Sequence, residues 1–157
     1  MKITLYFGNE SKKIPFGYLD RKDRRRVKNF PNLLNNSNFI SSRWLKFRVK
    51  KRRFCLSHKN GFSVLATCDK KIAIDMESFK QRDYLAVANF CFDEEELAFF
   101  NKAIDKKRAF YQIYTTKEAI LKFKNLNFKN LKEVSYFESN LNKTHLLFKN
   151  HFITIVF

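Results

Sequence analysis

The chain has 157 residues, the length of one domain with a sizeable core, and its apolar content of 45% with 19 phenylalanines excludes a disordered chain. It has no apolar run near the roughly 18 residues of a membrane span and no signal peptide, so we expect a cytoplasmic protein without a membrane partner. The net charge of +17 favours an acidic partner or an anionic ligand.

The N-terminal part of the chain is predicted to form one strand and two basic helices. Residues 1–7 read as a short strand that ends at Gly8. Residues 19–30 form a mostly solvated helix that stops before Pro31, and a second helix covers residues 38–50. Solvated helix faces are the usual explanation of so many basic residues.

The same basic residues allow a second interpretation, a small nucleic-acid-binding module. Residues 21–26 are nearly all Lys or Arg, and residues 43–53 interleave basic with aromatic side chains. However, no recognised nucleic-acid motif is present. The heavy use of Lys, Asn and Phe also follows from the base composition of a genome. We therefore keep this module as an alternative function and do not expect nucleic acid as the partner.

Two strands joined by a tight turn are predicted next. Residues 53–58 and 62–68 are strand-like and flank Asn60-Gly61, which is a strong hairpin signal. A third strand, residues 71–77, follows and completes a predicted meander. His58 lies beside the turn, where an exposed and inert side chain is the usual expectation.

The third strand carries two acidic side chains. Residues 72–77 alternate between apolar and other residues, so Asp75 and Glu77 project from the same face of the strand. Mg²⁺ is usually held by one or two carboxylates, with water and substrate phosphate completing its coordination. Two carboxylates on one strand face, joined by a third from a helix, could therefore converge on this cation.

Two helices are predicted to follow, over residues 79–91 and 96–102. Asp93 has the position of an N-cap, and Glu96 follows three residues later, which is the capping-box pattern. Acidic residues are also favourable at a helix N-terminus. Helix capping is therefore one interpretation of Glu96.

A long helix over residues 106–124 carries a dense group of charged residues. Glu118 and Lys122 lie one turn apart on one face, and an ordinary surface Glu–Lys pair would explain both. Lys117 points about 100° away from Glu118, into the apolar stripe that faces the core. A core-facing lysine needs a polar partner, so the surface pair does not explain Lys117.

The remaining elements are three short strands, predicted over residues 132–138, 144–148 and 151–157. Three cysteines are present without metal-ligand spacing, and we expect buried, reduced thiols at Cys55, Cys68 and Cys91.

The acidic strand and the long helix together resemble the signature of the 4′-phosphopantetheinyl transferases. That family carries an (I/V)G(I/V)D-x-E strand and, further along the chain, a (W/F)-x-x-KE-(A/S)-x-x-K helix. Residues 72–77 (IAIDME) and 114–122 (YTTKEAILK) match it, and the two glutamates are 118 − 77 = 41 positions apart. Ala73 stands where the family has glycine, and Tyr114 replaces Trp or Phe.

The resemblance implies an α+β fold of two pseudo-twofold-related halves, each with helices packed on a small antiparallel sheet. The order of the predicted elements, helices and then three strands in each half, fits this fold. We expect a single transferase domain over residues 1–157, with halves at residues 1–78 and 79–157. The compact chain is most similar to the monomeric, surfactin-synthetase-activating type.

The resemblance also implies an activity, the transfer of the 4′-phosphopantetheine arm of coenzyme A to a serine of an acidic acyl or peptidyl carrier protein, such as that of fatty acid biosynthesis. The other product is 3′,5′-adenosine diphosphate. A competing expectation is an inactive relative that binds coenzyme A without turnover.

The site residues follow from the same resemblance. The implied ligands of Mg²⁺, or of Mn²⁺ in its place, are Asp75, Glu77 and Glu118. The implied contacts of coenzyme A are Ser57, His58, Lys117, Lys122, Arg26 and Arg43, the last two for its 3′-phosphate. The implied catalytic residues are Glu118, Lys122 and Glu96, the last as a candidate base in addition to its capping role.

Overall fold

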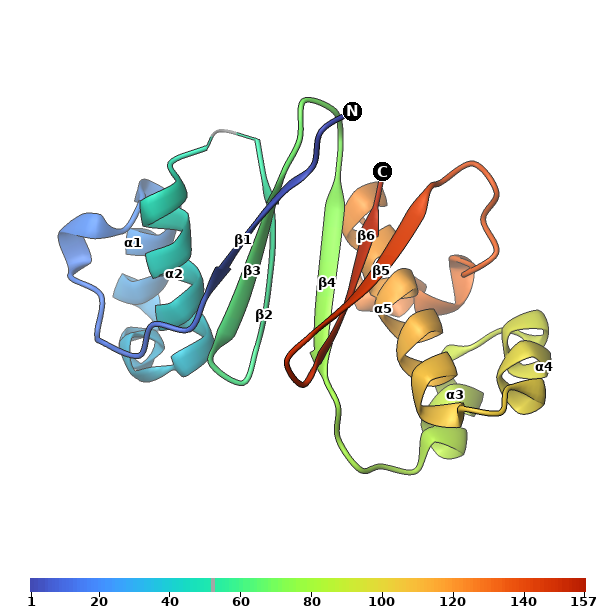
Figure 1. Cartoon of the computed structure of the whole chain (residues 1–157). Helices are drawn as coiled ribbons and strands as arrows, with labels where there is room; N and C mark the ends of the chain where they lie inside the picture. Colours follow the sequence, from blue (N-terminus) through green and yellow to red (C-terminus); the bar gives the residue numbers. More distant parts are fainter. Residues whose placement is uncertain (52) are drawn as a thin grey trace. The chain divides into compact units, whose positions relative to one another are not determined.

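The computed structural model describes residues 1–51 and 53–157, and the chain divides into two compact units, residues 1–69 and 70–157 (Figure 1). Arg52, which belongs to the basic stretch 43–53, lies outside the described residues. Each unit combines helices with a three-stranded antiparallel sheet, which confirms the predicted α+β class.

The sheet of the first unit has the strand order β1-β3-β2. Its strands are β1 (Thr4–Gly8), β2 (Cys55–Lys59) and β3 (Phe62–Thr67). Between β1 and β2 the chain forms η1 (Phe16–Tyr18), α1 (Arg21–Asn29), η2 (Pro31–Asn35) and α2 (Ser37–Val49), where η marks a 3₁₀ helix. Helix α2 packs against the sheet. The predicted strand, both helices and the hairpin are therefore confirmed.

Local sequence signals explain these elements. Asp20 caps α1 and Asn36 caps α2, each accepting a hydrogen bond from a backbone N–H three residues later. Asn60 and Gly61 both have positive φ, 50° and 76°, which is the conformation that a two-residue hairpin turn needs. Buried Asp23 joins α1 to α2, because its carboxylate accepts a hydrogen bond from Lys46 at 2.9 Å.

The second unit has the strand order β4-β6-β5. Its strands are β4 (Ala73–Ser78), β5 (Lys143–Phe148) and β6 (His151–Val156). Between β4 and β5 lie α3 (Tyr84–Cys91), α4 (Glu94–Lys102), α5 (Lys106–Lys124) and η3 (Phe128–Glu133). The long helix α5 packs against β4 and β6, and the hydroxyl oxygens of Thr115 and Thr154 lie 2.6 Å apart between helix and middle strand.

The predicted meander is wrong, because β4 pairs with β6 instead of joining the β2–β3 hairpin. Both units have the same order, one strand, then helices, then two strands, and in both the third strand lies in the middle. The strand at residues 71–77 therefore opens the second unit. The first compact unit ends at residue 69 and the second begins at residue 70. The single transferase domain expected over residues 1–157, with its approximate halves, stays a prediction.

The strand predicted over residues 132–138 is also absent. The chain instead forms η3, which begins after the capping residue Asn127, and then turns. Leu131 and Val134, three residues apart, are buried, which is a helical rather than a strand spacing. Of the three cysteines only Cys91 is buried, whereas Cys55 and Cys68 are half-exposed.

None of the helices within the described residues combines the length and the apolar character that crossing a membrane requires.

Candidate functional site

Strand β4 positions two carboxylates on one face of the sheet of the second unit. Asp75 lies opposite Thr154 and Glu77 opposite Phe152 of β6, so the two acids are separated by one residue and point the same way. Asp75 is 2% exposed and Glu77 is 8% exposed. Burying two charged side chains costs free energy unless they are paired or bind a cation.

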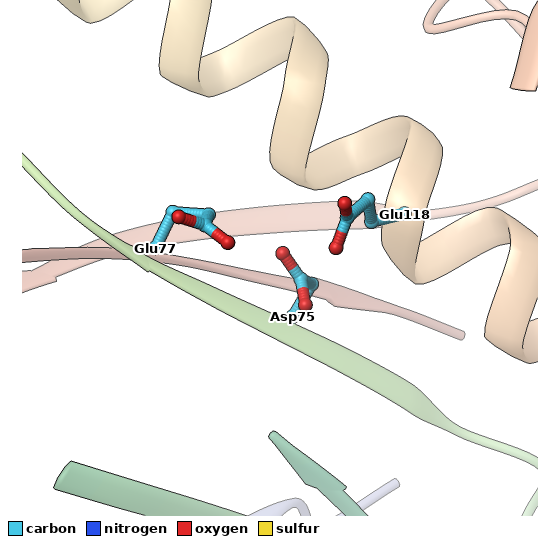
Figure 2. A group of neighbouring side chains, drawn as sticks. All are labelled: Asp75, Glu77 and Glu118. Carbon is cyan, nitrogen blue, oxygen red and sulfur yellow. The ribbon is translucent and has the colours of Figure 1, made fainter. Parts of the chain in front are cut away.

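Helix α5 brings the third carboxylate to the same place. Glu118 lies in the part of α5 that crosses β4, and Figure 2 shows its side chain pointing toward Asp75 and Glu77. Each of the three residues offers a carboxylate oxygen, and these oxygens lie within 4.8 Å of one another. The predicted convergence of a strand and a helix that are distant in sequence is therefore confirmed.

The surroundings of Glu118 disfavour its negative charge. Burial, first, and then the charge of Asp75 raise the pKa of Glu118 to about 7, and Glu77 adds to the effect. A hydrogen bond from the Tyr114 hydroxyl and the charge of Lys122 act in the opposite direction without cancelling the rise. The positive charge of Lys122 therefore does not balance the three carboxylates of the cluster.

The raised pKa predicts how the stability of the metal-free protein changes with pH. The folded state holds the proton of Glu118 more tightly than the unfolded chain, whose carboxyl has the ordinary value of 4.5. This contribution to stability is complete below pH 4.5 and is lost as the pH rises through 7. We measure the free energy of unfolding in urea with chelator present. Between pH 5 and pH 8 we expect it to fall by about 2 kcal/mol more in the wild type than in Glu118→Gln.

Glu138, an acid outside the cluster whose side chain is partly exposed, supplies the control for this measurement. Its carboxylate pairs with Lys124 at 2.8 Å, and Glu138→Gln should follow the wild-type pH dependence. If the free energy of unfolding changed with pH in the same way in the wild type and in Glu118→Gln, Glu118 would not hold its proton more tightly in the folded state than in the unfolded chain.

Lys122 provides a positive charge at the edge of the cluster. Its ammonium group donates hydrogen bonds to Asp75 Oδ1 at 2.7 Å and to the carbonyl oxygen of Ile74 at 3.0 Å. The Lys122 side chain remains 35% exposed, so it is not enclosed in the core. Lys122 can therefore hold Asp75 in place and also meet an anionic ligand.

The donor set fits a hard divalent cation. Mg²⁺ and Mn²⁺ prefer oxygen ligands, and all three side chains supply carboxylate oxygens. A cation bound there would offset the charges of Asp75 and Glu77, which add to the effect of burial on the pKa of Glu118. The convergence of three carboxylates is thus the observation of this structure that favours a metal site.

A second buried charged group lies in the same unit. Lys117 and Glu96 are both 0% exposed, and their Nζ and Oε2 atoms are 2.5 Å apart. Glu96 also accepts hydrogen bonds from the backbone N–H groups of Asp93, at 2.9 Å, and Tyr136, at 2.6 Å. The polar partner that the core-facing Lys117 was expected to need is Glu96.

The capping role predicted for Glu96 is confirmed, because Asp93 and Glu96 form both bonds of the capping box of α4. The role of Glu96 as a base stays a prediction, and its complete burial argues against it, since a base must reach the proton that it removes. The position of Lys117 likewise disagrees with the expected phosphate contact. Its ammonium group lies in the core, where Glu96 engages it.

A model of the 4′-phosphopantetheinyl transferase superfamily matches residues 71–153, more than half of the chain. The chain belongs to this superfamily. The matched residues include the three clustered carboxylates, Lys122 and the Lys117–Glu96 pair. Among curated proteins, none matches the chain. Members of the superfamily are transferases that act on coenzyme A and carrier proteins and use a divalent metal.

The remaining residues predicted for this transferase lie in the first unit, outside the matched range. Ser57 is buried and His58 is exposed on β2. Arg43 Nε lies 2.9 Å from Asp23, and Arg26, with a half-exposed side chain, lies 3.6 Å from the same carboxylate. Their contacts with coenzyme A stay predictions.

The sequence interpretation missed the hydroxyl of Tyr114 as part of the site. The transferase signature has Trp or Phe at this position, which offers no hydroxyl to a carboxylate. Here the hydroxyl donates a hydrogen bond to Glu118, and burial and that negative charge raise the pKa of Tyr114. The spacing Tyr114–Glu118–Lys122, one helical turn at each step, was the available signal.

Proposed function

We propose that the protein transfers the 4′-phosphopantetheine arm of coenzyme A to a serine of an acidic apo carrier protein and releases 3′,5′-adenosine diphosphate. The observation that carries the proposal is the meeting of Asp75, Glu77 and Glu118 within 4.8 Å in the part of the chain that matches the superfamily. The net charge of +17 suits both an anionic coenzyme and an acidic protein substrate.

The three carboxylates would hold Mg²⁺ or Mn²⁺. Bound there, the cation would supply positive charge for the oxygens of the transferring phosphoryl group. Lys122 contributes from the protein side, because its side chain is partly exposed and its ammonium group already lies beside Asp75. We propose Arg26, Arg43, Ser57 and His58 as further contacts of the coenzyme.

The reaction needs a proton acceptor and no covalent intermediate with the enzyme. The serine oxygen of the carrier forms a bond to the β-phosphorus of coenzyme A, the bond to the oxygen bridging the two phosphates breaks, and 3′,5′-adenosine diphosphate leaves with the electron pair. The serine proton passes to a base. Glu96 is the candidate from the sequence, although its complete burial argues against this role. No described side chain has the surroundings of an activated nucleophile.

The test is incubation of the protein with coenzyme A, Mg²⁺ and a panel of apo carrier proteins, scored by mass for the added arm. We expect modification of at least one carrier, and we expect excess chelator to stop it and added Mn²⁺ to restore it. A carrier modified at the full rate in chelator would refute the metal role. Coenzyme A binding without modification of any carrier would instead identify a binding protein.

A further inference from the structure

We propose that the face of helix α1 formed by Arg21, Arg24, Arg25 and Lys28 binds single-stranded nucleic acid, a role separate from the coenzyme contact proposed for Arg26. Helix α1 buries only Asp23 and Val27, which are one turn apart. Its six basic side chains, Arg21, Lys22, Arg24, Arg25, Arg26 and Lys28, are all exposed. This surface lies within the first unit, whereas the carboxylate cluster lies in the second.

The charge of α1 works against the stability of the helix itself. Residues 21 and 25, 22 and 26, and 24 and 28 form like-charged pairs one turn apart, which destabilise a helix. Arg21 and Lys22 also stand in the first turn, where the helix dipole disfavours cations. The one acidic side chain inside α1, Asp23, is buried and paired with Arg43 and Lys46, and it also lies 3.6 Å from Arg26. Arg26 and Lys28 stand in the last turn, where the helix dipole favours cations. Local stability therefore does not explain the charges of Arg21, Lys22, Arg24 and Arg25.

The kind of basic residue indicates the ligand. The chain has 10 arginines and 22 lysines, yet four of the six basic residues of α1 are arginines. A general preference for lysine does not produce this local excess. The planar guanidinium group binds phosphate with two parallel hydrogen bonds, which lysine cannot do.

An aromatic ring completes the surface. Arg21, Arg24, Arg25 and Lys28 share one helix face and line an open hollow of about 430 Å³ together with Phe16. The ring of Phe16 is 40% exposed although it is apolar. Proteins that bind single strands combine cations, which contact the phosphates, with an aromatic ring on which a base can stack. A duplex hides its base faces, so the ring favours an unpaired strand.

The experiment measures binding of a fluorescein-labelled 12-nucleotide oligo(U) RNA and an oligo(dT) of the same length by anisotropy. The test variant is Arg24→Gln/Arg25→Gln/Lys28→Gln. The matched control, Lys102→Gln/Lys129→Gln/Lys132→Gln, removes the same charge from exposed positions of the second unit. A further variant, Phe16→Ala, removes the ring without changing the charge.

We expect the α1 variant to weaken binding at least about tenfold and to reduce the slope of log K against log salt by about 2, since each lost phosphate contact accounts for about 0.7. Phe16→Ala should weaken binding about tenfold without changing that slope. The control should change affinity less than about threefold. Asp75→Asn should bind RNA like the wild type, which separates this proposal from the transferase function.

Three results would overturn the proposal. Equal losses in the control variant would show that net charge alone binds the strand. A preference for duplex of the same sequence would contradict the stacking role of Phe16. Tighter binding of α1 to vesicles with anionic lipid, or to an acidic carrier protein, than to the oligonucleotides would assign this face to another partner.

Discussion

Replacing Asp75 by asparagine is expected to abolish transfer to an apo carrier protein, with a loss of at least about a hundredfold. Asparagine has the same shape, so the variant removes one negative charge and little else. The carboxylate of Asp75 accepts a hydrogen bond from Lys122 and lies near the other two acids, and its loss would leave the cation with two carboxylate ligands. Glu118→Gln is expected to have the same effect, measured as the rate of arm addition by mass spectrometry.

The stability of these variants distinguishes a functional loss from a folding defect. Asp75 raises the pKa of Glu118, so removing its charge relieves repulsion within the metal-free cluster. We therefore expect Asp75→Asn to unfold in chelator at the same urea concentration as the wild type or at a higher one. Glu95, an exposed acid on α4, supplies the control, and Glu95→Gln should retain full activity. Wild-type activity in Asp75→Asn would end the assignment of this site.

Much of the second unit could be predicted because its signals are periodic. Alternation along residues 72–77 places Asp75 and Glu77 on one face, and the helical period places Glu118 and Lys122 on another. The predicted long helix over residues 106–124 has the observed bounds. The match to the transferase signature then indicated that these two faces meet, which periodicity alone does not indicate.

The partner of each face could not be predicted. A strand pattern shows which side chains share a face but not which strand lies beside it, so β4 was assigned to the preceding hairpin although it pairs with the last strand of the chain. For the same reason, the sequence indicates that Lys117 needs a polar partner but not that Glu96, 21 residues away, provides it. Pairing over long sequence separations is a property of the packed fold.

The largest loss of stability is expected for Lys117→Met, which should lower the free energy of unfolding by about 3–5 kcal/mol. Methionine fills the space of the lysine stem, so the variant leaves no large cavity. It does leave the carboxylate of Glu96 at 0% exposure without the ammonium group that lies 2.5 Å away in the wild type. The remaining backbone donors, from Asp93 and Tyr136, only partly satisfy that charge. Urea unfolding at neutral pH measures the loss.

The double variant Lys117→Met/Glu96→Gln shows whether the uncompensated charge is the cause. Because glutamine is neutral and still accepts a hydrogen bond, the double variant should be more stable than Lys117→Met alone, so the two effects should not add. Lys124→Met breaks the partly exposed pair with Glu138 and should lower the free energy of unfolding by less than about 1 kcal/mol. If Lys117→Met were as stable as this surface variant, the buried pair would contribute nothing to folding. If the folded double variant transferred the arm at the wild-type rate, Glu96 could not be the base, and its role would be to fix the start of α4 against α5 in the transferase core.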